Sequence, residues 1–110
     1  MSDLISKELL SLVLDKKITA IGDSKRNLLS YSDQLKNPSI NLNNVVNLDT
    51  LGRLFKEWIS NQKISVASGK DKKYFCMYRN LNHDETINAE SELEAIIKAT
   101  EQIAKEKGLL

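Results

Sequence analysis

The stretch that decides the fold is Lys63–Arg79, with the sequence KISVASGKDKKYFCMYR. Apolar and small polar residues alternate in its first part, Gly69-Lys70-Asp71 interrupts the alternation, and aromatic and apolar residues follow from Tyr74. Alternation with a period of two is typical of half-buried strands, and aromatic residues favour a pleated surface. The pattern therefore predicts a β-hairpin that turns at Gly69-Lys70-Asp71, with strands over Lys63–Ser68 and Lys73–Arg79.

An amphipathic helix is predicted on each side of this hairpin. Apolar residues recur at helical spacing in Leu48–Asn61, where Asn47 is a good N-cap, and in Glu92–Lys107. The second helix opens with the capping-box pattern Ser91–Glu94 and is followed by Gly108, which suits the left-handed residue after a helix. A third strand over residues 85–88 is expected between the hairpin and this helix.

The first half of the chain predicts a further helix and a second hairpin. Ser2 or Asp3 can cap the helix, which should end near Asp15 or Lys16. Its expected apolar face is formed by Ile5, Leu9, Leu12 and Val13. Strands are expected over Lys17–Ile21 and Arg26–Ser32 with a turn at Gly22-Asp23-Ser24, and a loop over Gln34–Asn44 with a short extended piece at Ile40–Leu42.

The whole pattern predicts an α+β fold in helix–hairpin–helix–hairpin–helix order, similar to an α-β-α sandwich, with an antiparallel β-sheet and helices packed on it. The two earlier strands are expected to join the central hairpin in this sheet. A chain of 110 residues is expected to form a single domain over 1–110. Its parts are a core unit over 47–108, an N-terminal helix and hairpin over 3–33, and a loop over 34–46.

The composition does not indicate a strongly charged partner. Hydrophobic residues make up 41% and charged residues 28% of the chain, which is ordinary for a globular protein, and 16 Lys and Arg nearly balance 15 Asp and Glu. The longest apolar stretch, Leu9–Leu14, is far shorter than the roughly 20 residues that cross a bilayer. Acidic Asp3 replaces the basic start of a secretory signal. We therefore expect a cytoplasmic protein without a membrane partner.

Chemistry-bearing motifs are absent from the sequence. The single cysteine, Cys76, lies in a predicted strand and is expected in the core, and Trp58 is likewise expected to pack there. The single histidine begins His83-Asp84-Glu85, which is expected to be a solvated turn. The four glycines form no phosphate-cradling motif. The sequence thus predicts no enzyme, no cofactor, and no catalytic or metal-binding residues.

The one feature that suggests a ligand is positive charge at the predicted turns. Its members, which could contact phosphates and stack on bases, are Lys25, Arg26, Lys70, Lys72, Lys73 and Tyr74. Lysines at a hairpin end also keep a sheet edge soluble, so the same residues fit a purely structural role. Helix–strand–strand–strand–helix is the element order of double-stranded RNA-binding domains. However, the acidic Ser91–Glu94 stands where that family places lysines.

Three segments carry a resemblance to a known family. They are Asn47–Leu51 continuing to Lys56-Glu57-Trp58, then Tyr74-Phe75-Cys76, then Glu94-Ala95-Ile96 with Ala99. In order and spacing they resemble small phage and prophage proteins that have a phage ABA-sandwich domain, over about the last two thirds of the chain. That family is largely uncharacterised, so the resemblance implies fold and origin, as an accessory protein in the cytoplasm of a bacterial host, and supplies no catalytic residues.

From these observations we expect a non-enzymatic accessory protein that acts as a protein–protein interaction module. Its partner would be a host or phage protein, and the chain could also form a homo-oligomer through a sheet edge. The alternative is a nucleic-acid-binding module that uses the lysine-rich hairpin tips.

Overall fold

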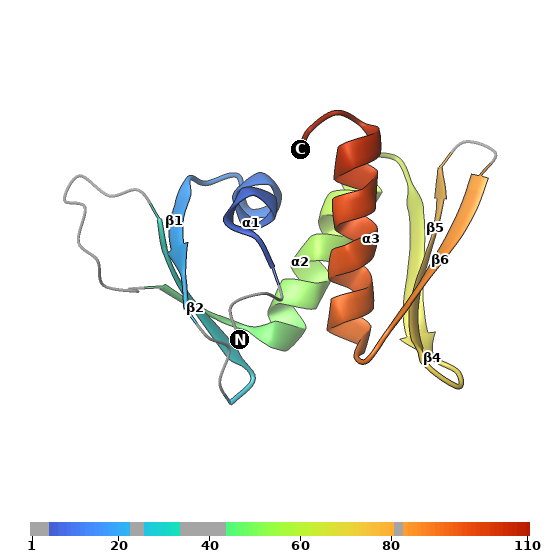
Figure 1. Cartoon of the computed structure of the whole chain (residues 1–110), viewed down its shortest axis with the longest axis horizontal. Helices are drawn as coiled ribbons and strands as arrows, with labels where there is room; N and C mark the ends of the chain where they lie inside the picture. Colours follow the sequence, from blue (N-terminus) through green and yellow to red (C-terminus); the bar gives the residue numbers. More distant parts are fainter. Residues whose placement is uncertain (1–4, 23–25, 34–43, 81–82) are drawn as a thin grey trace. The chain divides into compact units, whose positions relative to one another are not determined.

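The computed structural model describes residues 5–22, 26–33, 44–80 and 83–110. Within these residues three helices alternate with two groups of three strands (Figure 1). In chain order the elements are α1 (Lys7–Leu14), β1 (Ile18–Ile21), β2 (Leu28–Asp33), β3 (Asn44–Asn47), α2 (Leu48–Asn61), β4 (Ser65–Lys70), β5 (Tyr74–Asn80), β6 (His83–Ala89) and α3 (Glu92–Glu106). The predicted α+β class with antiparallel strands is confirmed.

The strands of the described segments form two separate antiparallel sheets, β1-β2-β3 and β4-β5-β6. The prediction of one sheet shared by both hairpins is therefore wrong. Each strand pairs with the strand next to it in sequence, which is the commoner arrangement for consecutive elements. The sheets lie in two compact units, an N-terminal unit (Met1–Leu51) and a C-terminal unit (Gly52–Leu110). The single-domain organisation over 1–110 is not tested by this division and stays a prediction.

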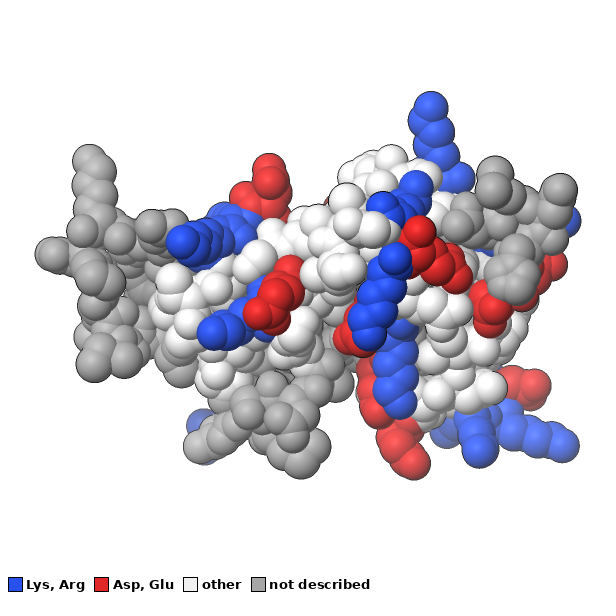
Figure 2. Space-filling view, turned by 45° about the horizontal axis from the view of Figure 1, so that its top comes forward, with Lys and Arg blue, Asp and Glu red and all other residues white. Residues whose placement is uncertain are grey.

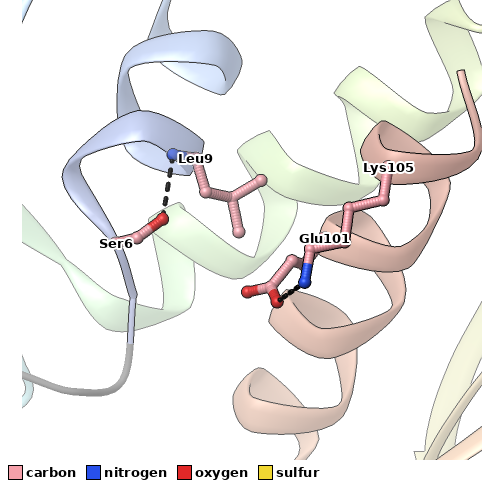
Figure 3. Close-up of polar contacts among 4 residues, drawn as sticks. All are labelled: Ser6, Leu9, Glu101 and Lys105. Atoms are coloured by element: carbon pink, nitrogen blue, oxygen red, sulfur yellow. Dashed lines mark hydrogen bonds and ion pairs between the residues drawn. The ribbon is translucent and has the colours of Figure 1, made fainter. Parts of the chain in front are cut away.

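Helix α1 of the N-terminal unit is short and capped at both ends. Ser6 precedes it, and its hydroxyl accepts a hydrogen bond from the Leu9 amide at 3.1 Å (Figure 3). The predicted caps at residues 2 and 3 lie outside the described residues. The helix ends at Asp15, as predicted, in the left-handed region with φ 54°. Just before that end, the Ser11 hydroxyl accepts from the Ile18 amide at 3.0 Å, which ties the helix to β1.

The first sheet is a meander with one irregularity. Strands β1 and β2 pair from Ile18 opposite Asp33, with a register shift before Ala20, and they match the predicted pair to within two residues. Strand β3 pairs with β2 and was missed by the sequence analysis, which placed a loop up to Asn44. Its sequence NVVN is short and flanked by asparagines, a residue type that is depleted in strands. The predicted turn at 22–24 and the extended piece at 40–42 fall mainly or wholly outside the described residues.

The second sheet is longer and regular. Strand β4 pairs with β5 from Ser65 opposite Arg79 to Lys70 opposite Tyr74, and β5 pairs with β6 without a shift. The predicted hairpin and third strand are confirmed. The turn, however, lies at residues 71–73, because β4 continues through Gly69 and Lys70. The alternating pattern of β4 ends at Gly69, so the sequence indicated the end of the strand there. Pairing with β5 nevertheless continues through Gly69 and Lys70.

Helix α3 covers this second sheet and contacts all three of its strands (Figure 1). The Ser91 hydroxyl accepts from the Glu94 amide at 3.1 Å, as the capping box predicts, and Gly108 follows with φ 73°. The buried stripe consists of Ala95, Ile96, Ile97, Ala99, Thr100, Ile103 and Ala104. On the other side of the helix, Lys105 pairs with Glu101 at 3.0 Å (Figure 3).

Helix α2 buries its predicted face only in part. Leu51, Phe55 and Ile59 are fully buried, whereas Trp58 is half-buried. Gly52 faces α3, since a Cβ atom built there would lie 3.6 Å from the Leu93 side chain. That distance is an ordinary contact, so the glycine marks where α2 and α3 approach each other inside the C-terminal unit.

Candidate functional site

The structure brings together only part of the predicted nucleic-acid set. Lys25 lies outside the described residues, and Arg26 is exposed in the N-terminal unit with φ 52°. Lys70, Lys72, Lys73 and Tyr74 all lie at the β4–β5 turn of the C-terminal unit and line one cavity of about 540 Å³. We call this the turn cavity.

The turn cavity is completed by residues that the sequence analysis did not assign. They come from the end of β6 and the start of α3, and they are Asn88, Ala89, Glu90, Glu94 and Lys98. Lys98 pairs with Glu94 at 3.2 Å, one helical turn away. A lysine four residues after a glutamate on a helix is an ordinary surface pair. Only the fold shows that this pair faces the hairpin turn.

The lysines of the turn cavity are not all engaged by neighbours. The Lys70 ammonium lies 5.1 Å from the centroid of the Tyr74 ring, a cation–π distance. Lys72 and Lys73 are exposed, and their ammonium groups have no hydrogen-bond or ion-pair partner within the described part of the chain. The turn therefore presents two uncompensated ammonium groups.

The opposite face of the second sheet presents apolar side chains. Strand alternation places Cys76 and Tyr78 on the buried side, so Phe75 and Met77 project from the other side. Met77, in the middle of the central strand, is 45% exposed. The Phe75 ring lies over Gly69 on β4, where a built Cβ atom would be 3.5 Å from it. We call this surface the outer face.

Two shallow hollows flank Met77 on the outer face. One, of about 170 Å³, is lined by residues of all three strands and ends at the Arg79–Asp84 ion pair of 3.3 Å. The other, of about 400 Å³, is lined by Phe75 and Thr86 and reaches Asp71, Lys72 and Lys73 of the turn. The outer face thus combines an apolar centre with a basic end, where two lysines outnumber one aspartate.

A chain of hydrogen bonds connects three elements on the helix side of this sheet. The Lys56 ammonium donates to the Ser68 hydroxyl at 3.2 Å, and that hydroxyl donates to the Glu92 carboxylate at 3.1 Å. Ser68 is opposite Cys76 in the ladder, and Cys76 is fully buried, as expected of a core residue. Burial raises the pKa of the Cys76 thiol to about 11, with smaller opposed effects of Lys56 and Glu92. The thiol is therefore protonated and unreactive at neutral pH.

The His83-Asp84-Glu85 segment forms the start of β6, so the prediction of a turn there is wrong. Its residues pair along β5, from Asn80 opposite His83 to Tyr78 opposite Glu85. Strand alternation turns the neighbouring side chains of Asp84 and Glu85 to opposite faces of the sheet. Among the described residues no group of three or more His, Cys, Asp and Glu side chains is placed to hold a metal ion.

The remaining charges are interspersed on the surface. Lysines and arginines alternate with acidic residues on the face in Figure 2. No helix in the described ranges is both long and apolar enough to span a membrane.

Comparisons with family models, curated proteins and solved structures give no match. The resemblance to phage ABA-sandwich proteins therefore stays a prediction that depends on the quoted sequence segments.

Proposed function

We propose that this chain is a non-enzymatic accessory protein of phage or prophage type that binds another protein in the cytoplasm of a bacterial host. The observation that carries the proposal is the outer face, where Met77 is 45% exposed at the centre of a three-stranded sheet. Large apolar side chains in the middle of a sheet are usually covered. Where they stay exposed between hollows, they are typical of interaction surfaces.

The outer face indicates which chemistry a partner surface should have. An apolar side chain of the partner would enter the hollow beside Phe75 and Met77, and carboxylates next to it would meet Lys72 and Lys73 at the basic end. Charge complementarity of this kind fixes orientation and speeds association. The expected partner surface is therefore an apolar and acidic segment of a protein.

The test compares two exposed strand residues, one in each unit. The tagged full chain is used to capture partners from bacterial lysate, as wild type, as Met77→Asp and as Val45→Asp. Val45 lies on β3 and is 58% exposed, so its substitution is a matched control. We expect a protein that wild type and Val45→Asp retain and Met77→Asp loses. Its purified form should bind Met77→Asp about thirtyfold more weakly, as for an interface hot spot.

Two results would contradict this proposal. One is the absence of any captured protein at micromolar chain concentration, and the other is equal retention by Met77→Asp and Val45→Asp. If a second copy of the chain occupies the outer face instead, Met77→Asp will abolish a concentration-dependent dimer in sedimentation velocity.

Nucleic-acid binding is the second candidate, and the turn cavity is the observation that favours it. It gathers Lys70, Lys72 and Lys73 beside the Tyr74 ring, as phosphate contact and base stacking require. The proposal predicts retention on heparin and on labelled RNA that weakens with salt. Changing the three lysines to glutamate should abolish that retention, whereas Lys105→Glu on α3 should preserve it. Flat binding isotherms at low salt for the wild type would exclude this function.

A further inference from the structure

The partner-binding proposal uses Lys72 and Lys73 of the turn cavity, but neither the volume of that cavity nor the rest of its lining. Four lysines and two glutamates line it, and Lys98 and Glu94 neutralise each other at 3.2 Å. Three ammonium groups, of Lys70, Lys72 and Lys73, then stand against the single carboxylate of Glu90, a net formal charge of +2. A ligand that balances this charge carries two negative charges.

The volume of the cavity leaves room for a ligand larger than a bare anion. It measures about 540 Å³. Sites for drug-sized molecules and cofactors typically span about 300–1,000 Å³. The Tyr74 ring and Ala89 offer apolar contact, and the Glu90 carboxylate can bond to hydroxyl or amino groups. The lining is thus basic at the turn and mixed apolar and polar toward β6.

We propose that the turn cavity binds a nucleoside monophosphate. Its phosphate monoester carries about −1.5 to −2 charges at pH 7 and would be held by Lys72 and Lys73, whose ammonium groups have no partner in the described residues. Its base would lie against Tyr74, with the Lys70 ammonium, now 5.1 Å from the ring centroid, turning to the phosphate. Lys72 and Lys73 are shared with the basic end of the outer face, but the inference does not use the apolar centre of that face.

The two glutamates separate this ligand from a nucleic-acid strand. A continuous phosphate backbone that crossed the cavity would bring further negative charges next to Glu90 and Glu94. Like charges in close contact disfavour binding, whereas a single terminal phosphate can stay at the lysine end. The geometry points to a small ligand with one phosphate monoester.

The test is a calorimetric titration of the full chain with adenosine monophosphate, adenosine and inorganic phosphate. We expect adenosine monophosphate to bind at least about tenfold more tightly than either fragment, because only it uses both ends of the cavity. The double variant Lys72→Gln/Lys73→Gln should bind adenosine monophosphate at least about tenfold more weakly than the wild type does, since charge-assisted bonds are lost. Glu90→Gln should raise the affinity, and Lys105→Gln, on α3 outside the cavity, is the matched control.

A pH profile gives an independent readout of the charge on the phosphate. Its second ionisation has a pKa of about 6, so the affinity of the wild type should fall between pH 7 and pH 5. The fall should be much smaller in the Lys72→Gln/Lys73→Gln variant.

Several results would overturn the inference. They are no heat of binding for adenosine monophosphate, equal affinity for inorganic phosphate, or an unchanged affinity in the lysine double variant. Tighter binding of a single-stranded oligonucleotide that lacks a terminal phosphate would favour nucleic-acid binding instead. Failure of partner capture is separate, because Met77→Asp should abolish capture and leave the affinity for adenosine monophosphate unchanged.

Discussion

The two units of the chain use the same ingredients with different regularity. Each combines a helix with an antiparallel three-stranded meander. In the N-terminal unit the helix has 8 residues and the first strand pair shifts register, whereas in the C-terminal unit α3 has 15 residues and both ladders run without a shift. Long regular ladders leave fewer backbone groups without partners. We therefore expect the C-terminal unit to be the more stable of the two.

Backbone strain also distinguishes the two units. Among the described residues, positive φ angles occur at the non-glycine residues Asp15, Arg26 and Asn27 in the N-terminal unit and at Lys63 in the C-terminal unit. A left-handed conformation at a non-glycine residue costs roughly 1–2 kcal/mol, less for Asn and Asp. The N-terminal unit therefore carries more of this cost, and four predictions test the comparison.

The largest effect is expected from removing a core side chain. Phe55→Ala should lower the free energy of unfolding by about 3–5 kcal/mol, because the ring is fully buried. Leu29→Ala, its counterpart on β2, should cost about 2–5 kcal/mol. Trp58→Ala should cost less than Phe55→Ala, since Trp58 is only half-buried. Urea unfolding measures all three, and hydrogen exchange should show the slowest amides in β5. Slower exchange in β2 would reverse the comparison.

Helix caps give a smaller effect that compares the units directly. Ser6→Ala and Ser91→Ala each remove a 3.1 Å hydrogen bond to the first turn of a helix. Each should cost about 0.5–2 kcal/mol in urea unfolding. We expect Ser6→Ala to unfold more of its helix, because α1 has 8 residues and α3 has 15. The helical circular dichroism signal before the main transition reports this, and an equal loss in both variants would contradict it. The matched controls are Ser6→Thr and Ser91→Thr, which keep a capping hydroxyl.

Relief of strain at the end of α1 should give a stabilising effect below about 1 kcal/mol. Asp15 holds φ 54° and donates its backbone N–H to the Ser11 carbonyl, a bond that glycine can also make. Asp15→Gly should therefore raise the urea midpoint, because glycine reaches this conformation without a Cβ clash. Asp15→Ala keeps a Cβ atom and serves as the control. A lower midpoint for the glycine variant would show that no strain is stored there.

The last effect is absent at neutral pH and appears only in alkali. Burial, together with the negative charges of Glu106 and Glu85, raises the pKa of Tyr78 to about 12 from 10.0. Because the folded pKa is raised, the stabilisation is complete below pH 10 and is lost as the pH rises toward 12. The free energy of unfolding of Tyr78→Phe should therefore fall less steeply than that of the wild type between pH 10 and pH 12. Near-ultraviolet circular dichroism measures unfolding over this range. Identical alkaline profiles would place the sensitive group elsewhere, and Cys76, with a pKa raised to about 11, is the next candidate.

Local patterns predicted the C-terminal unit well. The alternation before Gly69, the aromatic run from Tyr74 and the capping box at Ser91 each reflect a short-range rule, and each element formed where expected. The prediction missed strand β3, because its four residues, NVVN, carry no pattern of their own. They are held in a strand by their pairing with β2. The prediction of a single sheet was also wrong, since alternation says which face of a strand is buried but not which strands pair.

The candidate site was predicted at the turn but not beyond it. Lys70, Lys72 and Lys73 are neighbours in sequence, so their clustering needs no fold. Lys98 and Glu90 reach the same cavity only because the end of β6 and the start of α3 lie beside the β4–β5 turn. Met77 looked like an ordinary strand residue, and its 45% exposure on the central strand is a tertiary property.

The close contact of Phe75 with Gly69 makes these two positions depend on each other. The ring lies over the glycine, and a Cβ atom built there would be 3.5 Å from it, which is an ordinary contact. Alanine would therefore fit beneath the ring, and only a side chain larger than alanine would have to move it. An aromatic residue beside a strand glycine shields the backbone that the glycine leaves bare. In related chains we therefore expect the pair to change together. The loss of one should relax selection on the other, a signature of covariation that can be sought wherever such chains are sequenced.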